Sequence, residues 1–166
     1  MSHQESQLLY QALLYEQGHP RRTQHILKVY ALVKLLGEQD GRSEEERTIL
    51  QAAAILHDIA IRYCKEHHGG DARQELQQKE APALVRQFLE QAQYPTSLYA
   101  PVLELVLHHH DYQAPRGPLL QLLMEADLIV NCYESVPDAA ERARMQPLFR
   151  TTAGKELFAL CLQGLG

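Results

Sequence analysis

The sequence predicts an all-α protein of seven or eight helices. Hydrophobic residues recur at helical spacing along nearly all of the 166 residues, and no segment alternates convincingly like a half-buried strand. A chain of this length corresponds to about one domain. Because we find neither an internal repeat nor a low-complexity linker, we expect residues 1–166 to form a single domain.

Capping residues, glycines and prolines bound each expected helix. Ser43 and Glu46 form a capping box before the third helix, whose alanine-rich apolar run over residues 49–61 indicates a central position. Pro82 is expected in the first turn of the fourth helix, where proline is tolerated. The expected helices span about residues 2–16, 22–36, 43–61, 79–92, 97–110, 119–133 and 152–163, with a short one after Pro137.

Two polar segments separate these helices. Residues 64–77 contain two adjacent glycines and indicate a loop or a short surface helix. Residues 111–118 contain two prolines and a glycine and indicate a loop.

Composition narrows the class of function. The net charge of −5 argues against binding a nucleic-acid polymer or an anionic membrane surface. The N-terminal sequence MSHQESQLLYQALL lacks the basic and apolar regions of a signal peptide, and no apolar run is long enough to span a bilayer. The three cysteines are widely spaced and indicate free, buried thiols. We therefore expect a cytoplasmic protein.

Several polar residues fall where the helical period requires an apolar side chain. His25, His57, His109 and Asp127 each lie four and seven residues from apolar positions of an inward-facing stripe. Asp58 lies beside His57, four residues after an alanine. A buried carboxylate costs several kcal/mol unless it is paired, so Asp127 in particular is expected to have a strong partner.

Each of these residues also has a purely structural interpretation. A single inward histidine is usually bonded to a carbonyl, Asp127 could pair with an arginine, and Asp58 could cap a helix. One divalent cation, however, explains all five residues together. Imidazole and carboxylate ligands suit Mn, Fe, Co, Ni, Zn or Mg, whereas the lack of clustered thiolates disfavours a structural zinc site.

The order of these residues resembles a known family. The pattern His25, then the doublet His57-Asp58 at the end of an alanine-rich helix, then Asp127 in a later apolar helix is similar to the HD-domain metal-dependent phosphohydrolases, over about residues 20–135. The strings VLELVLHHHDY and MEADLIVN resemble a branch of small bacterial HD proteins. The resemblance implies a helical HD fold and makes these four residues metal ligands. Residues 138–164 are expected to pack on this core or to form the surface of a homodimer.

The resemblance also bears on a second metal. Relatives with two metals have two further histidines. At one of these places this sequence has Glu80, and at the other it has His109 within the run His108–His110. Consecutive helical residues point about 100° apart, so we expect His109 to face inward, His110 to contact substrate or a ligand, and His108 to be partly exposed. Glu80, His109 and His110 are therefore candidates for a second metal or for the substrate.

The activity that the resemblance implies is hydrolysis of a phosphate ester in a small, nucleotide-like metabolite by a metal-activated water. Asp58 would bind metal and hydrogen-bond that water. Lys28 and Arg62 lie one turn from His25 and Asp58 and are expected to face the phosphoryl oxygens, with Lys79 and Arg73 as weaker candidates. Substrate specificity is expected to come from the loops at residues 64–77 and 111–118.

Two other functions remain open at this point. One is a non-catalytic module that binds metal and nucleotide. The other is a di-iron oxygenase, in which Glu80 and His109 would complete the site.

Overall fold

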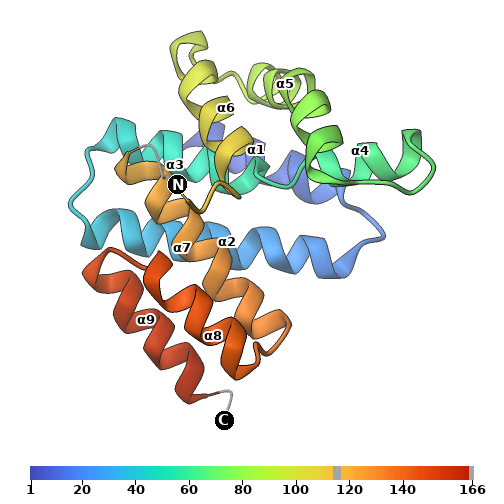
Figure 1. The fold of residues 1–166 in the computed structure, drawn as a ribbon. Helices are drawn as coiled ribbons and strands as arrows, with labels where there is room; N and C mark the ends of the chain where they lie inside the picture. The colour runs from blue at the N-terminus through green and yellow to red at the C-terminus, as the bar shows by residue number, and fades with distance from the viewer. Residues whose placement is uncertain (114–116, 165–166) are drawn as a thin grey trace.

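The computed structural model describes residues 1–113 and 117–164, and its regular elements over these residues are helices (Figure 1). They are α1 (His3–Tyr15), α2 (Pro20–Gln39), α3 (Glu44–Leu56), α4 (Ala60–His67), α5 (Gln74–Gln91), η1 (Thr96–Leu98), α6 (Tyr99–His108), α7 (Pro118–Glu134), α8 (Ala139–Met145), η2 (Gln146–Leu148) and α9 (Thr152–Gln163), where η marks a short 3-10 helix. The predicted all-α class is confirmed.

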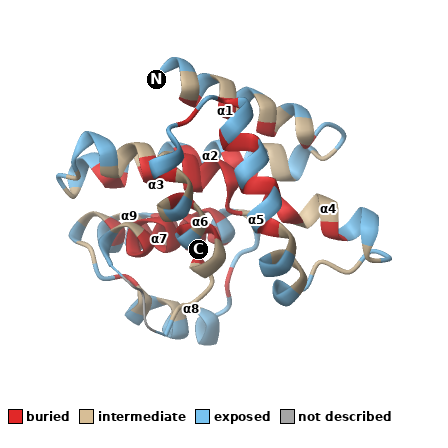
Figure 2. Cartoon of the chain, turned by 90° about the horizontal axis from the view of Figure 1, so that it is seen from above, coloured by how far each residue is buried: buried red, intermediate tan, exposed pale blue. Residues whose placement is uncertain are grey.

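The helix at the centre of the fold is α3, for which the alanine-rich run predicted a central position. Ala52, Ala53 and Ala54 are fully buried, and α1, α2, α6 and α7 all pack against this helix. Small side chains allow several neighbouring helices to approach one helix closely. Figure 2 shows buried residues in red along α2, α3 and α7, which places the core where these helices meet.

The third predicted helix is interrupted at the His57-Asp58 doublet. α3 ends at Leu56, the backbone turns over residues 57–59, and α4 begins at residue 60. The amide of Ile59 bonds the carbonyl of Leu56 at 3.1 Å, a tighter turn than the α-helical pattern. The expectation of one helix through residue 61 is therefore wrong, and the doublet lies at a helix end.

The segment at residues 64–77 is also more helical than expected. α4 covers its first residues and α5 its last, which leaves residues 68–73 between them. The Asp71 side chain accepts the Arg73 amide at 2.9 Å, and this local bond helps to begin α5 several residues early. Pro82 consequently lies inside α5 rather than in its first turn. Of the loop expected at residues 111–118, residues 114–116 lie outside the described part of the chain.

The last helices pack beside α7 and form a second apolar cluster. The rings of Phe149 and Phe158 stack there at 4.2 Å between centroids. Cys132 and Cys161 belong to this cluster, and all three cysteines are buried and free, as predicted. None of the helices in the described ranges combines the length and apolar character needed to cross a bilayer.

A buried carboxylate joins α7 to the start of α9. Glu125 has no exposed surface, and its Oε1 accepts the amides of Arg150 at 2.6 Å and Thr151 at 2.9 Å. The hydroxyl of Thr151 donates to the other carboxylate oxygen and also accepts the amide of Gly154 at 3.0 Å. Glu125 thus accepts two backbone amides just before α9 and the hydroxyl of the Thr151 N-cap.

We predict that Gly154→Ala destabilises the protein by about 1–3 kcal/mol because of overpacking. A Cβ atom at residue 154 would lie 2.6 Å from Cδ of Glu125 and 2.7 Å from Oγ1 of Thr151, so the bonds that begin α9 would have to shift. Thermal unfolding followed by circular dichroism measures the effect.

Gly37→Ala is the matched control. A Cβ atom at residue 37 of α2 would come no closer than 3.4 Å, to Cδ2 of Leu50 in α3, which is an ordinary van der Waals contact. Alanine is better than glycine inside a helix by roughly 0.5–1 kcal/mol, so the melting temperature should stay the same or rise. Equal melting temperatures for the two variants would contradict the prediction.

Candidate metal centre

The four predicted metal ligands meet between α2, the turn after α3, and α7. Nε2 of His25 lies 3.0 Å from Nε2 of His57 and 3.1 Å from Oδ1 of Asp127. Oδ2 of Asp58 lies 3.6 Å from the same nitrogen of His57 and 3.9 Å from that of His25. The structure therefore brings together, around one point, side chains that are up to 102 residues apart in the sequence (127 − 25).

Two of the histidines are held by the helices that they follow. His57 and His109 are the C-cap residues of α3 and α6. The Nδ1–H group of His57 donates to the carbonyl of Ala54 at 2.8 Å, and that of His109 donates to the carbonyl of Val106 at 2.7 Å. Because the hydrogen is on Nδ1, the lone pair of Nε2 faces the cluster in both rings. The negative ends of both helix dipoles also favour a cation there.

His25 is oriented by a carboxylate instead. Its Nδ1–H donates to Oε2 of Glu134 at 3.2 Å, which again leaves Nε2 free to face the cluster. Glu134 also lies 3.1 Å from Nζ of Lys28 and 3.8 Å from Nε of Arg21. The sequence analysis missed Glu134, although it lies seven residues after Asp127 on the same face of α7.

Several buried polar atoms of this cluster have no hydrogen-bond partner in the protein. Among the described residues, Oδ1 of Asp58, Oδ2 of Asp127 and Nε2 of His109 are buried without a hydrogen bond. The two Nε2 lone pairs of His25 and His57, 3.0 Å apart, also face each other. Unpaired buried acceptors and carboxylates are costly, and cations bound among these side chains would pair with them. The donor set therefore fits a divalent metal ion.

Asp58, His57 and His110 have pKa shifts toward the forms that bind metal, whereas the carboxylates of Asp127 and Asp58 outweigh burial and raise the pKa values of His25 and His109. Burial would raise the pKa of the Asp58 carboxyl, but interactions with the imidazoles of His57, His109 and His25 outweigh burial and hold the pKa well below its usual range. Burial lowers the pKa of His57, and burial together with the charge of His109 lowers that of His110 to about 4. Asp58 is thus ionised and these two imidazoles are neutral near pH 7, the forms that bind metal.

A second group of candidate ligands shares Asp58. The other carboxylate oxygen, Oδ1, lies 3.6 Å from Nε2 of His109, and potential ligand atoms of Asp58, His109 and His110 lie within 4.8 Å of one another. A cavity of about 20 Å³ adjoins both His109 and His110 and is lined on its other side by glutamines of α5. That volume is enough for a single water molecule. Asp58 is therefore placed between two candidate metal positions.

The three consecutive histidines differ in burial and in the side chains that they contact. α6 ends at His108, whose imidazole is half-buried and lies 3.6 Å from Glu104. His109 is buried in the cluster, and Nε2 of His110 lies 3.9 Å from Oδ2 of Asp127. Both residues can face the site because the helix has ended before them, so helical spacing does not set the angle between their side chains.

The other predicted site residues, Lys28, Arg62 and Glu80, differ in the side chains that they contact. Lys28 approaches through Glu134, as described above. Arg62 pairs with Glu66 at 2.7 Å and donates to the carbonyl of Tyr15, at the end of α1. Glu80 accepts from Nε2 of His68 at 3.1 Å. The contacts found for Arg62 and Glu80 are thus with residues outside the His and Asp cluster.

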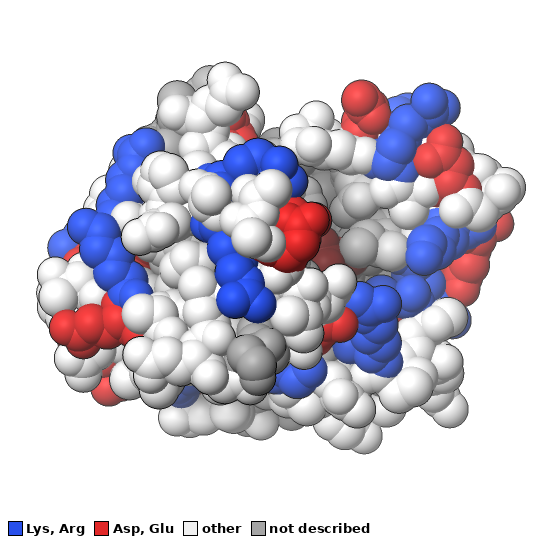
Figure 3. Space-filling view, turned by 60° about the horizontal axis from the view of Figure 1, so that its bottom comes forward, with Lys and Arg blue, Asp and Glu red and all other residues white. Residues whose placement is uncertain are grey.

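The two weaker cationic candidates are paired with acids at the surface. Lys79 lies 3.7 Å from Glu80, and Arg73 lies 3.0 Å from Asp71. Figure 3 shows the surface hollowed between two parts of the molecule, with Lys and Arg side chains on both sides of the hollow and acidic atoms at its edge.

Comparison with known proteins identified one family. The family model described as HD domain matches residues 22–132, which include every candidate ligand named above but neither Glu134 nor α8 and α9. No curated protein and no solved structure matched the chain.

We predict that Glu134→Gln weakens metal binding by about 10–100-fold, the usual cost of losing a carboxylate that orients a ligating histidine. Isothermal titration calorimetry with Mn²⁺ measures the dissociation constant. Glu90→Gln, a charge change on an exposed residue of α5, is the control and should bind as the unmodified protein does. Equal affinities for the two variants would remove Glu134 from the site.

Proposed function

Because this chain belongs to the HD-domain family, we propose that it is a metal-dependent phosphohydrolase that acts on a small phosphorylated, nucleotide-like metabolite. The observation that carries the proposal is the buried group of His25, His57, Asp58 and Asp127, in which imidazole nitrogens and carboxylate oxygens face one another. Burying these nitrogen and oxygen atoms together costs free energy, and a bound cation would offset that cost by pairing with them.

The residues that would hold a first metal are His25, His57, Asp58 and Asp127, and those for a second, weaker position are Asp58, His109 and His110. Nitrogen and oxygen donors without thiolates suit Mn, Fe, Co, Ni, Zn or Mg. A bound divalent cation supplies a water of lowered pKa and neutralises charge on phosphoryl oxygens.

Asp58 is the proposed catalytic residue. Its side chain is 22% exposed, more than those of the three other ligands of the first position, so it is the ligand that substrate and solvent can best approach. A carboxyl group whose pKa is held far below its usual range does not keep a proton. Asp58 therefore orients the attacking water by accepting its hydrogen bond rather than by storing its proton.

Lys28 is the better placed of the two proposed cations. Its ammonium group is held at the edge of the site by Glu134, and its side chain is 42% exposed, so it can turn toward a phosphoryl oxygen. Arg62 would first have to leave Glu66 and the carbonyl of Tyr15.

We predict that Asp58→Asn lowers phosphate release by about 100-fold or more, because the carboxylate both binds metal and orients the nucleophile. The assay uses a panel of phosphomonoesters and nucleotides with Mn²⁺, Co²⁺, Ni²⁺ or Mg²⁺. Asp40→Asn is the control: Asp40 pairs with Arg42 beyond the end of α2, and its loss should leave turnover unchanged.

The same assay separates the alternatives. Unchanged turnover in Asp58→Asn contradicts the role given to Asp58. Metal binding with nucleotide-dependent thermal shifts, but with no turnover by the unmodified protein, indicates a non-catalytic binding module. Two irons per chain with consumption of O₂ would indicate the oxygenase, for which Glu80 would have to leave His68.

A further inference from the structure

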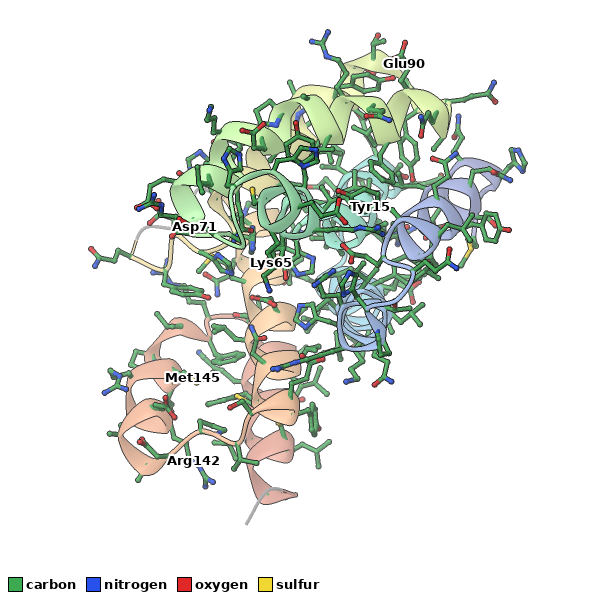
Figure 4. The ribbon with its side chains drawn as sticks, turned by 90° about the vertical axis from the view of Figure 1, so that its right-hand side faces the viewer. Tyr15, Lys65, Asp71, Glu90, Arg142 and Met145 are labelled. Carbon is green, nitrogen blue, oxygen red and sulfur yellow. The ribbon has the colours of Figure 1, made fainter. Side chains whose placement is uncertain are left out.

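A separate pocket of about 370 Å³ lies beside the metal centre, between α7, α8 and the residues that follow α6. Figure 4 shows α8, with Arg142 and Met145, alongside α7. The residues that line this pocket include Tyr112, Leu128, Asn131, Cys132, Arg144 and Met145. Its volume is near the lower limit for small-molecule pockets, room for one group about the size of a nucleoside.

Residues that line the pocket are neighbours of candidate metal ligands on α7 and in the segment after α6. Asn131 follows Asp127 by four residues on α7, so it lies about 6 Å further along the helix axis and on nearly the same face. On the other side, the ring of Tyr112 lies 6.1 Å from that of His110, between centroids. A phosphate at the metal ligands and an organic group in the pocket would therefore be about one helical turn apart.

The lining suits a flat, uncharged group. Sγ of Cys132 and Sδ of Met145 lie 4.0 Å apart and, with Leu128 and Tyr112, form an apolar wall of polarisable atoms, which pack well on aromatic rings. Exposed Asn131 provides an amide with both donors and an acceptor, the pairing that the edge of a nucleobase requires.

The charged groups at the pocket are few and at its rim. Arg144 is exposed, and a guanidinium group there can stack on a π-system or meet a phosphate. Glu141, the acidic lining residue, accepts the amide of Asp138 at 2.9 Å in the capping box of α8. The interior of the pocket therefore favours a neutral ring over a charged phosphate group.

We propose that this pocket binds the nucleobase of the substrate while its phosphate lies at the metal centre. The proposal rests on the phosphohydrolase function proposed above and names its substrate class as nucleoside phosphates. The α8 side of the pocket lies outside the residues that match the family model. Base preference would then depend on Tyr112, on the pocket-lining residues of α7 and on α8.

Nucleoside binding tests the pocket without metal or turnover. Adenosine, guanosine, cytidine and uridine, which carry no phosphate, are titrated into the protein in the presence of a chelator and followed by ligand-observed NMR. We expect at least one nucleoside to bind, and Ser135→Trp, which places a large ring at the exposed rim, to weaken that binding about 10-fold or more. Val136→Trp is the control, since Val136 is 56% exposed and outside the lining.

The outcomes distinguish this proposal from the proposed function. Nucleoside binding that is lost in Ser135→Trp and kept in Val136→Trp supports the pocket, whether or not the protein hydrolyses phosphate esters. No nucleoside binding, or equal binding by both tryptophan variants, overturns it. If glycerol phosphate is hydrolysed in that case, the phosphohydrolase function stands without a base pocket.

Discussion

The structure depends on one electrostatic constraint: two carboxylates and two imidazoles of the proposed first site meet in a protein core. Asp127 is almost fully buried, and oxygens of both Asp58 and Asp127 have no protein donor among the described residues. Burying such carboxylates is costly unless opposite charge pairs with them, and a bound cation would supply that charge. The positions of α2, α3 and α7, which carry these side chains or lead into them, must therefore be compatible with a cation at this point.

The C-terminal ends of α3 and α6 orient two of the candidate ligands. His57 and His109 both follow the last residue of a helix, and each bonds a carbonyl that the last turn leaves unpaired. The same bond fixes the tautomer of the ring and directs Nε2 into the site. Helix termination and ligand placement are thus one interaction, which is why the break between α3 and α4 falls at the His57-Asp58 doublet.

α7 organises the rest of the site. Along one face it presents Asp127 to the cluster and, two turns later, Glu134 to His25. Asn131, which lies between them in the sequence, lines the neighbouring pocket together with residues of α8. Buried Glu125 on the same helix anchors the start of α9. One helix therefore carries Asp127, the carboxylate that orients His25 and part of the pocket lining.

The sequence by itself determined the helical class, the alanine-rich central helix and the inward positions of His25, His57, His109 and Asp127, because hydrophobic periodicity is a local property that the chain carries along its length. It did not determine the residues at which helices begin and end, and so it extended the third helix through residue 61, beyond the doublet, and missed the earlier start of α5. Glu134 and the pairing of Glu80 with His68 depend on contacts between elements distant in the sequence. Only the tertiary structure decided these, because the crossing of helices, and not their periodicity, sets which side chains meet.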